Sequence, residues 1–435
     1  MSKMKDSNVE WIGLIPNNWD ICRFKDYYRN IKEIAGEKSI EYERLALTLN
    51  GVIKRQKDDS DGLQPKAFDT YQILNQNDFV FKMIDLQNIS TSRVGLSPYT
   101  GLVSPAYMRF SPISNKRNTK FDYYFLMSMY YNCVFNNLGG NGVRSALNAT
   151  DMGSFIIPNP DDEVKEKIVT YLEKKMSQIE QLMHIQEKQI ENLKAYKQSL
   201  IAEVVTRGLS ANPILKNSGV SWIKEIPANW EVKPLKYIAT FGKGLPITKA
   251  NLIDNGIPVI SYGQIHSKKN NGTNIKDELL RYVDKNYIDS HPQCVVKKGD
   301  IIFADTSEDK EGIGNAVYQD KDSIIFAGYH TVIAKMTNIQ QGRYLSYLFL
   351  SNYWRSQLRS VASGIKVFSV TQNMLNNVSV ILPDETEQRE IINLLDQKCF
   401  EIDRLIDIKE EKIKKLDEYK KSLIFECVTG KKEVV

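Results

Sequence analysis

The chain is poor in the residues from which disulfide frameworks and metal sites are built. Its 435 residues include 5 cysteines and 4 histidines. The cysteines are scattered, odd in number and without a Cys-x-x-Cys pair, so we expect no disulfide framework and a reduced, cytoplasmic protein. His291 and Cys294 have a metal-like spacing, but no second ligand pair accompanies them, and we expect no metal site.

Long hydrophobic runs are also missing. No stretch of about 18 apolar residues occurs, so a membrane span is not expected. The first residues are polar and mixed in charge, unlike the apolar core of a signal peptide. Apolar residues make up 42% of the chain and charged residues 26%, which is typical of a globular protein. The length predicts roughly two to four domains.

Motifs that carry catalysis are absent as well. No GxxxxGK[ST] phosphate loop is present, which excludes a motor ATPase of that type, and no Asn-Pro-Pro-Tyr methyltransferase loop occurs. The segment 161–165 resembles a fragment of a nuclease site, but its acids stand where a helix begins and are better explained as helix caps. We therefore expect no catalytic residue and no cofactor in this chain.

The net charge is positive in two separate blocks and negative in the segments that follow them. Residues 1–150 contain 19 basic and 15 acidic residues, and residues 220–379 contain 19 and 14. Residues 151–211 contain 8 basic and 10 acidic residues, and residues 380–435 contain 11 and 14. Two basic blocks suit a polyanion bound at two places, although surplus lysine often serves only solubility.

The sequence repeats itself. Val9-Glu10-Trp11-Ile12 and Ile15-Pro16 with Trp19 return 211 residues later as Val220-Ser221-Trp222-Ile223 and Ile226-Pro227 with Trp230. The segment Tyr196–Ile201 returns 223 residues later as Tyr419–Ile424. Between these segments the halves scarcely resemble each other. This predicts a duplicated layout of variable block, helix, variable block, helix.

Each half closes with a long helical pattern. Apolar residues recur there at alternating spacings of three and four, which is typical of a coiled-coil seam. The two seams coincide at the 223-residue offset, including their polar members, Gln186 with Lys409 and Lys197 with Lys420. The residues expected to pair the helices are Leu172, Met176, Ile179, Met183, Ile190, Leu193 and Leu200 in the first, and Leu395, Ile402, Ile406, Ile413, Leu416 and Leu423 in the second.

We expect the two helices to pair with each other as an antiparallel coiled coil that acts as a spacer. The alternative is that each helix forms its own homodimer. The expected domains are a first variable block at 1–157, a spacer helix at 158–211, a linker and second variable block at 212–382, and a second spacer helix at 383–435. The variable blocks combine short predicted strands with short buried helices, so the fold class is mixed α/β (α+β).

The repeated segments resemble those of the specificity subunits of type I restriction–modification systems. The matching features are the openings with Trp-Ile and Ile-Pro-x-x-Trp, the segment 382–391, the Tyr-Lys-x-Ser-Leu-Ile tails and the stretch Gly101–Tyr107. The resemblance covers the whole chain. One departure is that the pair Glu387-Gln388 is replaced by Val164-Lys165 in the first half.

The resemblance implies a DNA reader. Each block would read one half of an asymmetric, bipartite site in double-stranded DNA, and the helices would set the gap and dock two modification subunits. Those partners would methylate adenine with S-adenosylmethionine, and added restriction and translocase subunits would use ATP and magnesium. The alternative is a coiled-coil adaptor whose blocks bind proteins; steeply salt-dependent DNA binding would favour the reader.

Polar and basic loop residues are the candidates for DNA contact. Asparagine can bind adenine, and arginine can bind guanine or phosphate. For each candidate, a solvated loop remains an open alternative. The candidates are Asn88, Ser90, Arg93, Asn141 and Arg144 in the first block, and Lys243, Gln264, Lys268, Lys269, Asn270 and Lys366 in the second.

Overall fold

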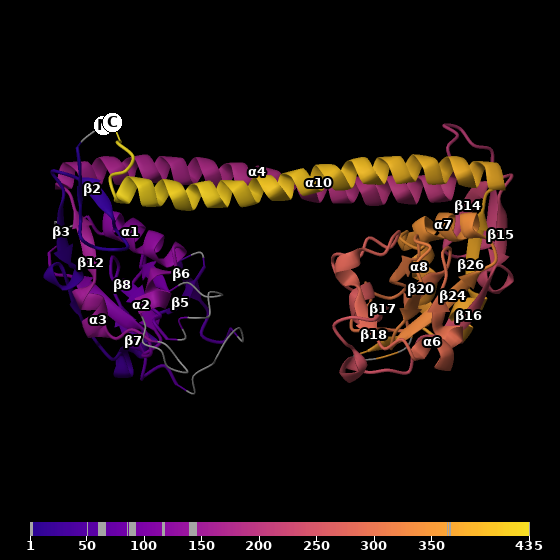
Figure 1. Cartoon of the computed structure of the whole chain (residues 1–435), viewed down its shortest axis with the longest axis horizontal. Coiled ribbons are helices and arrows are strands. Elements are labelled where there is room, and N and C mark those ends of the chain that lie inside the picture. The colour runs from indigo at the N-terminus through magenta and orange to yellow at the C-terminus, as the bar shows by residue number, and fades with distance from the viewer. Residues whose placement is uncertain are drawn as a thin grey trace. The chain divides into compact units, whose positions relative to one another are not determined.

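A computed structural model gives the structure of the chain, and it describes residues 3–49, 51–59, 67–84, 86, 93–114, 118–138, 146–362, 364 and 367–434. The chain divides into two compact units. Unit 1 consists of residues 1–187 and 410–435, and unit 2 of residues 188–409. Each unit contains one β-rich block together with part of each of the two long helices (Figure 1).

Unit 1 contains two four-stranded sheets. The first has the order β6-β5-β10-β7 and the second β4-β11-β8-β9. Helix α1 follows the strand β11, and its Phe121 and Phe125 are fully buried in the core of the unit. The elements of the block are β1 Met4–Asp6, β2 Leu14–Pro16, β3 Asp20–Arg23, β4 Tyr28–Asn30, β5 Arg44–Thr48, β6 Gly51–Arg55, β7 Gln72–Leu74, β8 Phe79–Phe81, β9 Val94–Leu96, β10 Gly101–Val103, β11 Met108–Pro112, α1 Thr119–Tyr131, α2 Val134–Leu138, α3 Ala149–Ser154 and β12 Ile156–Asn159.

Unit 2 also contains two four-stranded sheets, with the orders β18-β17-β23-β19 and β16-β24-β20-β22. Its elements are β13 Leu215–Val220, β14 Ile223–Pro227, β15 Glu231–Pro234, β16 Ala239–Lys243, β17 Ile257–Ile260, α5 Tyr262–Ile265, β18 Arg281–Val283, α6 Tyr287–Ser290, β19 Val295–Val296, β20 Ile301–Ala304, β21 Thr306–Ser307, β22 Ala316–Tyr318, β23 Ile325–Ala327, β24 Thr331–Met336, α7 Ile339–Leu348, α8 Asn352–Val361, β25 Phe368–Ser369, α9 Gln372–Asn377 and β26 Ser379–Leu382.

The two blocks share one strand order although their sequences differ. In the first sheet of each unit an antiparallel strand pair, β5–β6 or β17–β18, is joined by a parallel strand, β10 or β23, and then by an antiparallel strand, β7 or β19. In the second sheet all neighbouring strands are antiparallel in both units. The duplication predicted from the matched ends of the halves therefore extends through the variable blocks.

The long helices are α4, Asp162–Arg207, and α10, Glu385–Val428. In unit 1 the first part of α4 pairs with the last part of α10, where Lys420 bonds Glu180. In unit 2 the last part of α4 pairs with the first part of α10, where Lys197 bonds Asp403. The order of these contacts along the chain makes the pairing antiparallel (Figure 1), and the predicted antiparallel coiled coil is confirmed.

Every residue expected at the seam is buried or half-buried. Leu172 and Leu395 are fully buried, and the polar seam member Gln186 is buried as well. The residues of the two helices that lie outside the seam are mostly exposed. The boundary between the two compact units falls within both helices, whereas the expected domain boundaries follow the helix ends.

The end of each long helix packs against the tryptophan that follows an N-terminal hairpin, which is β1–β2 in unit 1 and β13–β14 in unit 2. Gly430, just after α10, lies against Pro16 and Trp19 in unit 1, and Gly208, just after α4, lies against Trp230 in unit 2. Both glycines have positive φ, +69° and +75°, as a helix C-terminus of this type requires. The end of the first half thus packs against the start of the second half, and the end of the second half packs against the start of the first.

Candidate nucleic-acid interface

The predicted contact residues of unit 2 lie around α5 and the end of β16. Lys243 is exposed at the last position of β16 and pairs with Val332 of β24. Gln264 lies in α5, and its Oε1 accepts a hydrogen bond from the Ser261 amide at 3.1 Å, which caps that short helix. The run 268–270 follows α5 within the connection from β17 to β18. Lys366 lies outside the described residues.

The side chains of the three residues in that run differ in how far they are available for contact with DNA. Lys268 and Lys269 are exposed, and Lys269 forms an ion pair with Glu278 at 2.5 Å. Asn270 donates hydrogen bonds to the carbonyls of Ile265 at 2.8 Å and Ala316 at 3.1 Å, and its Oδ1 accepts from the Gly272 amide. The side chain of Asn270 is thus used to hold the loop, whereas Lys268 and the ion-paired Lys269 lie at the surface.

A cleft of about 580 Å³ opens beside α5 in unit 2. The ring of Tyr262 forms one wall and lies 5.3 Å from the ring of His330. The carboxylates of Glu308, Asp309 and Glu311 line its rim. Because carboxylates repel phosphate, the cleft itself is a poor site for the DNA backbone, and the exposed lysines lie outside it.

A chain of hydrogen bonds fixes the floor of this cleft. Arg355 Nη1 donates to Asn315 Oδ1 at 2.7 Å, and Asn315 Nδ2 lies 3.0 Å from His266 Nδ1. His266 Nε2 lies 2.7 Å from the Thr306 carbonyl, which can only accept. This arrangement assigns the imidazole proton to Nε2 and holds the ring in one orientation.

Asn88, Ser90, Asn141 and Arg144 lie outside the described residues. Arg93 is fully buried, and its Nη2 donates to the Leu86 carbonyl at 2.6 Å. The guanidinium thus holds the backbone at Leu86 and is not presented to solvent. DNA contact by the candidate residues stays a prediction.

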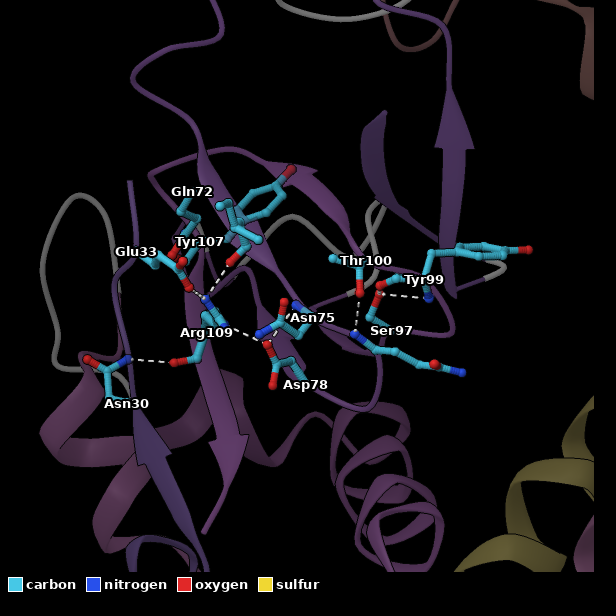
Figure 2. A network of polar contacts seen from close by, with 12 residues as sticks. Asn30, Glu33, Gln72, Asn75, Asp78, Ser97, Tyr99, Thr100, Tyr107 and Arg109 are labelled. Atoms are coloured by element: carbon cyan, nitrogen blue, oxygen red, sulfur yellow. Dashed lines mark hydrogen bonds and ion pairs between the residues drawn. The ribbon is translucent and has the colours of Figure 1, made fainter. Parts of the chain in front are cut away.

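The sequence reasoning missed a buried polar network that joins the two sheets of unit 1 (Figure 2). Arg109 of β11 donates through Nε to Asp78 at 2.6 Å and through Nη1 to the carbonyl of Ile73 in β7 at 2.6 Å. The exposed Glu33 completes the ion-pair group, with Arg109 Nη1 at 3.2 Å from its carboxylate. Since β11 and β7 belong to different sheets, this network fixes how the sheets meet.

The network continues into the turn that follows β10. Gln72 is buried, and its Nε2 donates to the carbonyls of Ser104 at 3.0 Å and Tyr107 at 2.6 Å. Gln72 and Tyr107 are labelled in Figure 2. Burial raises the pKa of the Tyr107 phenol, and the nearby Arg44 and Arg55 oppose that rise. The stretch Gly101–Tyr107, singled out in the sequence, therefore places an aromatic ring beside basic residues.

The polar members of the helix seam have partners that the seam pattern alone did not predict. Lys197 bonds both carboxylate oxygens of Asp403 at 2.7 Å, and Lys420 bonds Glu180 at 2.7 Å. The two pairs are related by the 223-residue offset. Lys409 also bonds Gln189 at 2.6 Å. Polar contacts of this kind fix the register of paired helices.

Exposed apolar residues recur on the helices at the same offset. In each unit, a leucine and an isoleucine from one helix accompany a tyrosine from the other, and all six side chains are at least 40% exposed. The groups are Leu182, Ile185 and Tyr419 in unit 1, and Leu405, Ile408 and Tyr196 in unit 2.

These groups lie away from the β-rich blocks. In unit 1, Glu180 and Asp417 face Tyr131 of α1, and in unit 2, Asp396 bonds Tyr347 of α7. The apolar residues stand one position before seam residues, whereas these acidic residues stand one position after them, so the two sets lie on opposite sides of the seam. We call the two groups the apolar helix patches.

Two copies of one mixed fold, each joined to a long helix, define a duplicated two-unit protein. The family described as "Type I restriction modification DNA specificity domain" matches residues 23–212 and 227–418. The chain belongs to this family. The DNA-specificity role expected from the sequence is confirmed, and no finding supports the adaptor alternative.

Curated relatives match along nearly the whole chain. The type I restriction enzyme MjaVIII specificity subunit of Methanocaldococcus jannaschii is 25% identical over 446 residues, covering 99% of this chain and 97% of the relative. The putative type I restriction enzyme MjaX specificity subunit of the same organism is 23% identical and covers 97% of this chain and 95% of its own.

Solved structures share the fold. A chain from a study of complex assembly and conformational transition of the type I R-M system has a TM-score of 0.67 at 15% identity, covering 95% of this chain and 98% of that chain. The HsdS subunit of Thermoanaerobacter tengcongensis has a TM-score of 0.50 at 15% identity, with 96% and 98% covered. Across the described ranges, no helix is long and apolar enough to cross a membrane.

Proposed function

We propose that the chain reads an asymmetric, bipartite site in double-stranded DNA, with one half-site bound by each unit. The observation that carries this proposal is that the two blocks repeat one strand order with unrelated sequences. Equal folds give two equivalent readers, and unequal side chains give them different targets. The long helices would set the gap between the half-sites.

The apolar helix patches would dock two modification subunits. An exposed apolar group on each unit needs a partner, and its repetition at a fixed offset suits two copies of the same partner. The chain would supply recognition, and the modification subunits would methylate adenine with S-adenosylmethionine. Restriction and translocase subunits with ATP and magnesium would complete the complex in the cytoplasm.

Binding measurements on the assembled methyltransferase test the proposal. A reader should bind DNA with an affinity that falls steeply with salt, because phosphate contacts release counterions. It should also favour duplexes with both half-sites over duplexes with one. Salt-insensitive binding to protein partners without DNA binding would contradict the proposal.

A further inference from the structure

The β5–β6 hairpin of unit 1 concentrates basic side chains. Arg44 opens β5 and pairs in the ladder with Arg55 at the end of β6, beside Lys54. Lys57 lies two residues after Arg55, and the four basic residues line a cleft of about 450 Å³. Only two acidic residues, Glu41 and Glu43, line the same cleft, so its charge is positive.

Aromatic rings accompany these cations. Lys54 Nζ lies 5.2 Å from the centre of the Tyr99 ring, and Lys57 Nζ lies 5.9 Å from that of Phe68. Arg44 and Arg55 lie near Tyr107, whose turn is held by the buried network described above. The rings and the network limit the conformations of the basic side chains, which reduces the entropy lost when they bind an anion.

The existing contacts of the lysines can be exchanged for phosphate. Lys54 pairs with Glu43 at 2.5 Å, but the two side chains are 49% and 61% exposed. An ion pair this exposed is screened by water and contributes little to stability. Lys57 donates to the Ser39 carbonyl at 2.7 Å, and an ammonium group has three donors.

Unit 2 supplies a second observation at the equivalent pair of strands. Its counterpart of β5–β6 is β17–β18, and the connection between those strands carries the exposed Lys268 and Lys269. Arg281 opens β18 and is exposed as well. The two strand pairs have unrelated sequences, yet both place several basic residues at this point in the fold.

We propose that the β5–β6 hairpin binds the sugar–phosphate backbone of the DNA, with Lys54, Arg55 and Lys57 each contacting a phosphate. The inference rests on the proposed function and adds the surface on which unit 1 holds its half-site. Phosphate contacts position a protein on the duplex without reading its sequence. These residues therefore set affinity and leave the recognised sequence to other side chains.

The test uses the chain assembled with its modification subunits and carrying Lys54→Gln, Arg55→Gln and Lys57→Gln. Binding to a duplex with the methylated motif is measured across a series of salt concentrations. Each lost phosphate contact lowers the slope of log K against log[salt] by about 0.9, so the slope should fall by about three. At 0.1 M salt the affinity should fall on the order of 100-fold, and the methylated motif should stay the same.

Two controls separate the local site from general electrostatics and from misfolding. Replacing Lys120, Lys167 and Lys174 with glutamine removes the same charge elsewhere on unit 1 and should leave the slope near that of the wild type. The charge-retaining variant Lys54→Arg with Lys57→Arg should keep the slope as well. If the triple variant fails to assemble, Lys54→Gln alone should lower the slope by about one.

A slope and an affinity equal to those of the wild type would overturn the inference. A changed methylated motif would overturn it too, because the residues would then be reading bases. A wild-type complex without salt-dependent DNA binding would instead contradict the proposed function itself.

Discussion

Shortening both long helices by one heptad should shorten the gap between the half-sites. The deletion removes Gln186–Asn192 from α4 and Lys409–Lys415 from α10. These stretches face each other in the antiparallel pair, since Gln189 bonds Lys409. The ion pairs Lys197–Asp403 and Lys420–Glu180 lie on either side of the deleted stretches and would keep the register.

The size of the effect follows from helix geometry. Seven residues shorten a helix by about 10 Å at 1.5 Å per residue, and this equals about three base pairs at 3.4 Å each. A heptad is close to two full turns, so the seam stays in phase with a rotation of only about 20°. We therefore expect the modified motif to keep both half-sites and to lose about three base pairs from its gap.

Sequencing of methylated adenines in cells that carry the variant measures the gap directly. Deleting the heptad from α4 alone is the matched control, because it leaves seven residues of α10 without a partner and should prevent assembly. If the double deletion assembles and methylates the original motif with its original gap, the helices do not set the spacing.

Three substitutions test other parts of the account. Leu405→Glu places a charge in one apolar helix patch and should weaken binding of one modification subunit about tenfold or more; native mass spectrometry that still finds two bound subunits would argue against docking there. Arg109→Leu leaves the buried carboxylate of Asp78 without its cation and should lower the free energy of unfolding by about 3–5 kcal/mol; a loss under about 1 kcal/mol in a denaturant titration would show that the network is not needed. Glu387→Ala removes the acceptor of the buried Trp230 indole N–H, 2.9 Å away, and should cost about 1–3 kcal/mol, while Glu387→Gln, which can still accept, should cost less in the same titration.

The frame of the fold was predictable because its signals are local and repeated. The alternating spacing of apolar residues gave the seam, and the 223-residue offset gave the matched helices. The same offset relates Glu180 to Asp403, so the partners of Lys420 and Lys197 could have been found by asking which acids recur beside the seam.

One departure from the repeat has a structural explanation. Gln388 donates to the Pro383 carbonyl at the start of α10. Lys165 takes its place at the start of α4, where the buried ammonium bonds Asn159 and Asp162, both at 3.0 Å. Different side chains thus hold the same helix terminus, which is why the mismatch in sequence does not disturb the fold.

The interface was harder to predict because burial there depends on distant contacts. Arg93 reads as a loop arginine, yet the fold buries it completely. The sequence makes Asn270 a candidate for base contact, but its side-chain amide donates to the carbonyls of Ile265 and Ala316, the latter 46 residues away. The basic hairpin was missed because Arg44 and Arg55 are ordinary strand residues until the sheet pairs them.

A genome-wide map of adenine methylation, compared between cells with and without this chain, tests the central claim most directly. The account predicts that removing the chain abolishes methylation at one asymmetric motif made of two half-sites with a fixed gap, and that restoring the chain restores it. Loss of a continuous or symmetric motif would contradict the proposal that the two units bind different half-sites separated by a gap. Unchanged methylation in cells that contain active modification subunits would contradict the DNA-reading role.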